Sequence, residues 1–275
     1  MGLNLKNINY GNQSNNADTL VIDYCENKVS FCEIESNTFK PVFIANYIIA
    51  ENDNNASLLK AINYLDFSKK NYKAVYINYF SEQFTLCPNH FYDETLKKDF
   101  LQFNCGSVGT KIILTNDISS NINLIYSIPE TLKSLFDQLF PNHQLKHSIC
   151  VLAQLAINSN EFKNDSILLH INESHIEFIV KQEQQLVLAN QFSIKTEQDV
   201  LYYLLFLIEQ YQLNPLAINV CVSGNLTSDS ELYLLLKKYI KNLRLASGHK
   251  NLIYTDINGA PQHFNYTLLN RIFCE

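Results

Sequence analysis

The chain has 275 residues, of which 47% are hydrophobic, 12% aromatic and 17% charged, and its formal net charge is −6. A chain of this length and apolar content can bury a core, which excludes a disordered, collagen-like or coiled-coil protein. The acidic balance, with Arg244 and Arg271 as the only arginines, argues against partners such as nucleic acid or an anionic membrane surface.

The N-terminal segment, residues 1–17, is polar and has no apolar run, so it does not read as a signal peptide. No apolar stretch elsewhere reaches the length of a membrane helix. We therefore expect a cytoplasmic protein with no membrane insertion. The seven cysteines are odd in number, form no CxxC pair and mostly lie in apolar runs, which predicts buried, reduced thiols.

Apolar runs in the first half predict a hairpin, a third strand, a helix and a fourth strand. A polar turn separates the two runs of the hairpin. Asn55 or Ser57 can cap the helix, whose apolar positions share one face. The predicted strands cover residues 19–25, 29–34, 39–49 and 72–80, and the predicted helix ends at Phe67.

The middle region predicts a less regular set of short elements. Pro129 suits the first turn of a helix, because the N–H that proline lacks has no partner there. The predicted strands cover residues 84–87, 111–114 and 122–128, and the predicted helices cover residues 93–103, 129–140 and 147–157.

The second half has clearer signals. Thr196, followed by acidic residues, predicts the start of a helix that runs to Tyr211. Ser228 predicts the start of a helix that runs to Ile240. The predicted strands cover residues 166–171, 175–181, 185–192 and 216–223, whereas the stretch 263–273 fits either a helix or a strand.

Both halves thus carry the order strand, strand, strand, helix, strand. Three antiparallel strands followed by a parallel strand reached through a helix predict a mixed sheet with helices on its faces. The fold class is therefore α/β, with two mixed β-sheets flanked by helices. We divide the chain into a polar tail (1–17), a first subdomain with the inserted middle region (18–158) and a second subdomain (159–275).

Four segments of the chain carry a family resemblance. They are FTLCPNHFYDETLKKDFLQFN (Phe84–Asn104), TEQDVLYYLLFLIEQYQLNP (Thr196–Pro215), VSGNLTSDSELYLLLKKYI (Val222–Ile240) and the ending HFNYTLLNRIFCE. With the repeated strand order, they resemble an uncharacterised bacterial family with a duplicated ribonuclease-H-like (actin-like ATPase) fold. The resemblance covers the chain from about Leu20 onward. It implies two actin-like subdomains but no established activity, because these segments carry no catalytic chemistry.

Actin-like ATPases hold a nucleotide between their halves, with an Asp-x-Gly turn from each half near the phosphates. The resemblance places Asp23 at the aspartate position of the first half, but Cys25 replaces the glycine and Glu26 follows it. In the second half, His170 stands at the aspartate position and Asn172 at the glycine position. A bulkier side chain at each glycine position would crowd a phosphate.

A later turn of actin-like ATPases faces the adenosine, and here it is Ser223 and Gly224, with one glycine of the usual pair. Glu26 and Glu173 would each repel a triphosphate by about 1 kcal/mol per charge pair. We therefore read Asp23, Asn172, Ser223 and Gly224 as vestigial candidates in a cleft, and expect no catalytic residue and neither ATP nor magnesium as a cofactor.

Two other clusters invite a functional reading. His143, His147 and Cys150 have residue types that bind zinc, but Pro141 makes a continuous helix doubtful and no fourth ligand is evident. We favour a histidine pair at a helix start and a core cysteine. The basic group of Lys237, Lys238, Lys241 and Arg244 reads as a solvated helix end rather than an anion site.

These observations favour a non-catalytic scaffold or adaptor that binds another, unidentified protein. The alternative is a nucleotide- or small-ligand-binding sensor with a degenerate ATPase-like site. A homo-oligomer is a third possibility, because the helix over residues 200–211 is apolar around much of its circumference.

Overall fold

A computed structural model of the chain describes residues 8–25, 28–48, 54–162, 164–254, 257 and 261–274. Contacts divide the chain into two compact units. Unit 1 comprises Met1–Val151, Lys250–Ala260 and Thr267–Glu275, and unit 2 comprises Leu152–His249 and Pro261–Tyr266. The sequence-based division differs from this grouping, because it assigned the whole stretch 159–275 to the second subdomain.

Unit 1 is built on a six-stranded mixed sheet with the order β1-β4-β3-β2-β5-β9. The first four strands in this order pair antiparallel, and β5 and β9 continue from β2 in parallel. The strands are β1 (Ile8–Gly11), β2 (Thr19–Cys25), β3 (Lys28–Glu35), β4 (Lys40–Ile48), β5 (Ala74–Tyr79) and β9 (His143–His147).

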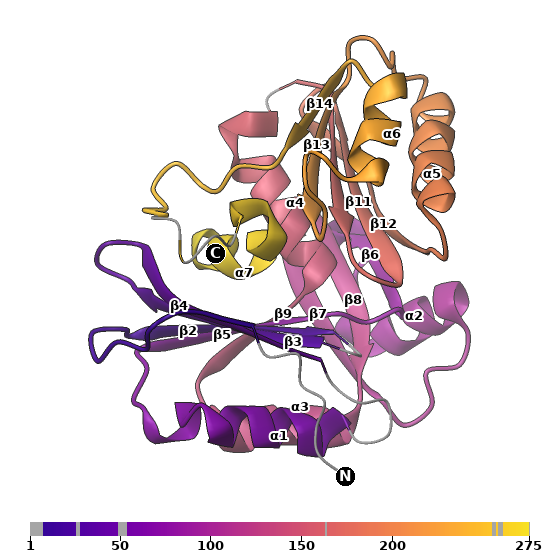
Figure 1. Ribbon diagram of the computed structural model, residues 1–275. Helices are drawn as coiled ribbons and strands as arrows, with labels where there is room; N and C mark the ends of the chain where they lie inside the picture. The colour runs from indigo at the N-terminus through magenta and orange to yellow at the C-terminus, as the bar shows by residue number, and fades with distance from the viewer. Residues whose placement is uncertain are drawn as a thin grey trace. The chain divides into compact units, whose positions relative to one another are not determined.

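Two helices lie together on one face of this sheet, α1 (Asn54–Tyr64) and α3 (Glu130–Leu139) (Figure 1). Tyr24 of β2 meets Phe136 of α3 edge to face, with ring centroids 6.0 Å apart. Phe67, in the 3₁₀ turn after α1, packs on Phe31 of β3 with centroids 5.1 Å apart. This face is therefore an aromatic-rich core.

The opposite face of the sheet is covered by the C-terminal part of unit 1. Val21 and Ile44 from the sheet share a buried cluster with Leu252, Leu268 and Leu269. The last two belong to α7 (Tyr266–Asn270), which is followed by the 3₁₀ turn η6 (Arg271–Phe273). This burial explains why the end of the chain groups with unit 1.

The region between β5 and α3 forms a small sheet of its own, with the antiparallel order β6-β8-β7. Helix α2 packs against it through Leu101, which shares a cluster with Cys87, Val108 and Ile125. The elements are β6 (Phe84–Pro88), α2 (Lys97–Cys105), β7 (Ile112–Ser119) and β8 (Ile122–Ile128), with 3₁₀ turns η2 (Asn89–Phe91) and η3 (Glu94–Leu96).

Unit 2 is built on a five-stranded mixed sheet with the order β12-β11-β10-β13-β14. β10 is antiparallel to β11, as β11 is to β12, whereas β10, β13 and β14 run parallel. The strands are β10 (Ser166–Ile171), β11 (His175–Gln182), β12 (Gln185–Ser193), β13 (Asn219–Gly224) and β14 (Asn242–Leu245). This order repeats that of β4, β3, β2, β5 and β9, so the predicted internal repeat is confirmed.

Helices α5 (Glu197–Gln210) and α6 (Glu231–Tyr239) pack side by side over one face of this sheet (Figure 1). On the other face, the ammonium of Lys181 donates hydrogen bonds to the carbonyls of Ala156 and Phe162, at 3.0 and 2.9 Å. These carbonyls belong to α4 (Ser148–Asn158) and the turn η4 (Asn160–Phe162).

Most predicted elements are confirmed, and the exceptions concern ends and short strands. The predicted capping of α5 by Thr196 is confirmed as a full capping box with Asp199. Helix α6, however, is capped by Ser230, whose hydroxyl accepts a hydrogen bond from the backbone N–H of Tyr233, so the prediction of Ser228 was wrong.

Other predicted boundaries also shift. Asn55 and Ser57 lie inside α1, which begins at Asn54, and Pro129 directly precedes α3. β13 begins at Asn219 rather than at Leu216. The undecided stretch 263–273 is helical, as 3₁₀ and α turns.

All seven cysteines are free thiols, five of them buried, as the sequence predicts. None of the helices within the described residues is both long and apolar enough to cross a membrane.

Candidate functional site

A row of polar side chains crosses the sheet of unit 1 near the carboxyl ends of its parallel strands. Pairing in register aligns Asn46 of β4, Ser30 of β3, Asp23 of β2, Asn78 of β5 and Lys146 of β9. Because residues paired across neighbouring strands point to the same face, these five side chains share one surface of the sheet. We call them the unit 1 row.

Asp23 lies at the centre of the unit 1 row and already accepts two hydrogen bonds. The amide of Asn78 donates to Oδ1 of Asp23, and the hydroxyl of Thr267 donates to Oδ2 at 2.6 Å. Burial raises the pKa of the Asp23 carboxyl to about 6, against the opposing effect of both hydrogen bonds and of the charges on Lys28 and Arg271.

Thr267 belongs to the C-terminal segment that covers this face of the sheet, and Arg271 follows one helical turn later. Arg271 is fully buried and lies 4.7 Å from the centroid of the Tyr76 ring. Its Nη1 donates to the carbonyl of Cys274 at 2.7 Å, and that carbonyl also accepts from Lys146 at 3.2 Å. The C-terminal segment of the chain therefore contacts the unit 1 row at Asp23 and Lys146.

A corresponding row crosses the sheet of unit 2. Register aligns Gln191 of β12, Glu177 of β11, His170 of β10 and Ser223 of β13. Nδ1 of His170 lies 2.8 Å from the hydroxyl of Ser223, and both residues are buried. Since β10 and β13 repeat β2 and β5, His170 occupies the level of Asp23, as the sequence comparison of the halves expects.

Asn172 directly follows β10 and forms the turn that leads into β11. Its side-chain amide donates to Nε2 of His175 at 3.0 Å and approaches the carboxylate of Glu177 at 3.4 Å. Burial lowers the pKa of His175 to about 4, so the ring is neutral at neutral pH and its nitrogen accepts this hydrogen bond. The side-chain amide of Asn172 is thus engaged in hydrogen bonds within this hairpin.

Gly224 ends β13 with a positive φ of 99°. A Cβ atom there would lie 2.0 Å from the carbonyl oxygen of Ile171, the residue that Gly224 pairs with in β10. The same carbonyl accepts a hydrogen bond from Asn225 at 3.1 Å. Glycine is therefore required by the close approach of two strands, independently of any ligand.

The four candidates fall into two groups. Asn172, Ser223 and Gly224 lie together at the carboxyl ends of β10 and β13, and Asp23 belongs to unit 1. Cys25 is half-buried at the end of β2. Of the two glutamates expected to repel phosphate, Glu173 is exposed, and Glu26 lies outside the described residues.

Sequence reasoning missed Asn78, Thr267 and Arg271. Asn78 had a usable signal, because it is a polar residue inside the apolar run YKAVYINYF, at the level of Asp23 on a strand expected to pair with it. Thr267 and Arg271 had none, because the stretch around them fitted either a helix or a strand.

The zinc reading of His143, His147 and Cys150 finds no support, because no cluster suited to a metal ion occurs within the described residues. His147 ends strand β9, and its buried ring accepts from the backbone of Ile149 at 3.1 Å. Arg244 lies in β14 and forms an ion pair with Glu161, so it is separate from the lysines of the α6 end.

Gly224→Ala is expected to lower the free energy of unfolding by about 3 kcal/mol, since the new methyl group meets a backbone carbonyl and the conformation is strained. Urea unfolding followed by circular dichroism measures this. Gly109→Ala is the matched control: φ is also positive but no atom lies within 4 Å, so a loss of about 1 kcal/mol is expected. Equal losses would contradict the packing argument.

Asp23 should make stability fall as the pH rises. Its folded pKa of about 6 exceeds the ordinary value of 3.8, so the folded protein binds more protons between these values. The free energy of unfolding then falls by up to about 3 kcal/mol from pH 4 to 7. Asp23→Asn should lack this component in urea unfolding at each pH. An unchanged pH profile would show that Asp23 ionises normally.

His175 should act in the opposite direction. Its folded pKa of about 4 lies below the ordinary 6.5, so the unfolded chain binds more protons between these values. The neutral His175 therefore contributes up to about 3 kcal/mol to the free energy of unfolding above pH 6.5, and this contribution is lost as the pH falls towards 4. His175→Gln, which keeps an acceptor for Asn172, should remove this acid sensitivity. Persistence of the full acid loss in the variant would refute the assignment.

Comparison with known proteins identifies the fold and the family. A crystal structure of a Bacteroides thetaiotaomicron protein with an actin-like ATPase fold and unknown function matches with a TM-score of 0.74 and 21% identity, over 84% of this chain and 91% of that one. The PilM-PilN type IV pilus biogenesis complex matches with a TM-score of 0.54 and 11% identity, over 84% and 88%. The ethanolamine utilization protein EutJ from Carboxydothermus hydrogenoformans matches with a TM-score of 0.52 and 10% identity, over 93% and 89%.

No curated protein matches the sequence. A family model described as a protein of unknown function (DUF3822) matches residues 8–243, which is most of the chain. The chain has the actin-like ATPase fold and belongs to the DUF3822 family.

Proposed function

We propose that this protein is a non-catalytic scaffold or adaptor that binds another protein. The observation that carries the proposal is the hydrogen bonding of Asp23, the one candidate that keeps an acidic residue at the aspartate position of an Asp-x-Gly turn. Each of its carboxylate oxygens already accepts a hydrogen bond from the protein's own chain, one from Asn78 and one from Thr267. A magnesium ion or its waters would have to compete with both.

The residues at the phosphate positions fit a magnesium nucleotide poorly. Burial raises the pKa of Asp23 to about 6, so about one-tenth of the carboxyl is still protonated at pH 7. His170, at the second aspartate position, is bonded to Ser223 and supplies no carboxylate. Cys25 and Asn172 stand where glycines let backbone N–H groups approach a phosphate.

One of the fold neighbours supports a protein partner. The pilus biogenesis structure contains PilM together with PilN, so a chain of similar fold works in a complex of two proteins. At 11% identity this likeness concerns the fold alone, and the partner of PilM is not carried over. Fold and function separate readily in such families, so the argument depends mainly on the residues of this chain.

Calorimetric titration tests the nucleotide side of the proposal. We expect no heat of binding when the purified full chain is titrated with ATP or ADP, with magnesium, up to about millimolar ligand, an affinity corresponding to about 4 kcal/mol. Saturable binding that Asp23→Ala weakens would instead identify the degenerate-site sensor and overturn the proposal.

A reconstitution experiment tests the partner side. The tagged chain is expressed in the organism that encodes it, and captured proteins are compared with those on an unrelated bait of similar charge. A reproducibly enriched protein is then purified and titrated against the chain. Saturable one-to-one binding supports an adaptor. Absence of any partner, together with concentration-dependent self-association in light scattering, would favour a homo-oligomeric structural protein instead.

A further inference from the structure

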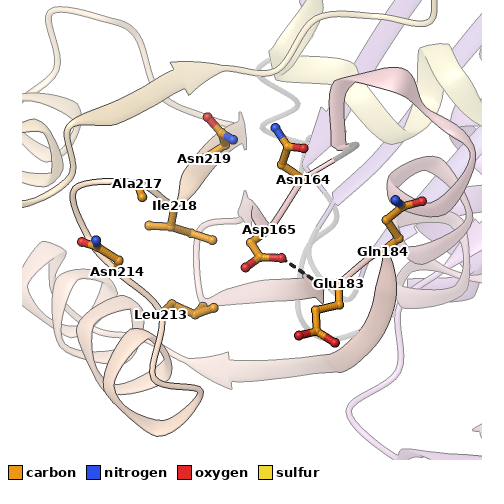
Figure 2. A pocket seen from close by; sticks show the side chains of 9 residues that line it. All are labelled: Asn164, Asp165, Glu183, Gln184, Leu213, Asn214, Ala217, Ile218 and Asn219. Carbon is orange, nitrogen blue, oxygen red and sulfur yellow. Dashed lines mark hydrogen bonds between the residues drawn. The ribbon is translucent and has the colours of Figure 1, made fainter.

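The second unit contains a cavity at the end of its sheet opposite to the polar row. It has a volume of about 570 Å³ and lies where β10 and β13 begin (Figure 2). Three connections surround it: the residues before β10, the β11–β12 turn and the loop from α5 to β13. All of these belong to unit 2, so the cavity is a feature of that unit alone.

The polar lining of this cavity is acidic and rich in carboxamides. Asp165 and Glu183 contribute carboxylates, and Asn164, Gln184 and Asn219 contribute amides (Figure 2). No lysine, arginine or histidine is among its described lining residues. Such a lining attracts a cation and repels phosphate or carboxylate groups.

One carboxylate is held in place by the neighbouring turn. Oδ1 of Asp165 accepts a hydrogen bond from the backbone N–H of Glu183 at 2.8 Å, drawn as the dashed line in Figure 2. Its other oxygen, Oδ2, makes no hydrogen bond within the described part of the chain. Asp165 therefore keeps a positioned acceptor available to a ligand.

The cavity also has an apolar part. Leu213 and Ile218 line it while belonging to the buried core of unit 2, and Figure 2 shows Ile218 close to the middle of the lining, beside Asp165. None of the described lining residues is aromatic. Carboxylates next to an aliphatic surface match a positively charged nitrogen on a methylene stem.

We propose that this cavity binds an alkylammonium group, its nitrogen paired with Asp165 and Glu183 and its methylene stem against Leu213 and Ile218. Two sources have this chemistry, a lysine side chain of a polypeptide and a free polyamine. The site is separate from the two polar rows and does not depend on the proposed adaptor function.

The test is a titration of the full ¹⁵N-labelled chain, followed by NMR, with acetyl-tetralysine amide and, separately, with spermidine. We expect shifts concentrated in residues 164–165, 183–184 and 213–219. The double variant Asp165→Asn/Glu183→Gln should weaken binding by about tenfold, as two partly exposed ion pairs allow. In Asp165→Asn the side-chain oxygen still accepts from Glu183, so the turn is kept.

The matched control is Glu173→Gln/Glu231→Gln, which removes the same charge from exposed positions of unit 2 outside the cavity and should change affinity less than about twofold. Tighter binding of tetralysine than of spermidine assigns a protein side chain, and the reverse assigns a polyamine. Equal weakening in both double variants, shifts elsewhere, or equal binding of Nε-acetylated tetralysine would overturn the proposal.

Discussion

The in-register pairing of a parallel strand with the first strand of the hairpin determines which polar side chains meet in both units. It places Asp23 beside Asn78 in unit 1 and His170 beside Ser223 in unit 2. A buried polar group needs a hydrogen-bond partner, and the residue paired with it on the next strand can provide one. The central pair of each row is thus hydrogen-bonded within its own unit, whereas Asn78 Oδ1 and Gln191 Oε1 have no hydrogen-bond partner among the described residues.

The repeated strand order and the long helices could be predicted from sequence because they depend on local periodicity and caps, as Thr196 illustrates. The short strands β9 and β14 could not. The segment HQLKH reads as a turn before a helix, and it becomes a strand only because β5 offers a parallel edge. The capping residue of α6 was misplaced because Ser228 and Ser230 have the same capping chemistry, and only the backbone distinguishes them.

The candidate site shows the same limit. Asp23, Ser223 and Gly224 could be found from the resemblance to actin-like ATPases. The groups that bind Asp23 could not, because Thr267 is 244 positions away in the chain. The structural role of Gly224 also differs from the ligand-binding role that was expected. Its missing side chain makes room for the carbonyl of Ile171, a packing requirement that sequence alone cannot separate from a ligand-binding one.

The discontinuous make-up of unit 1 affects the order in which the protein can be made. Residues 152–249 of unit 2 leave the ribosome as one continuous stretch, whereas one face of the first sheet waits for Leu268 and Leu269. Until then, Val21 and Ile44 remain open to water and to neighbouring nascent chains, although their strands were synthesised first. The first sheet, although its strands are made early, is therefore covered on this face only once the end of the chain has been synthesised, and unit 2 likewise gains its Pro261–Tyr266 segment late.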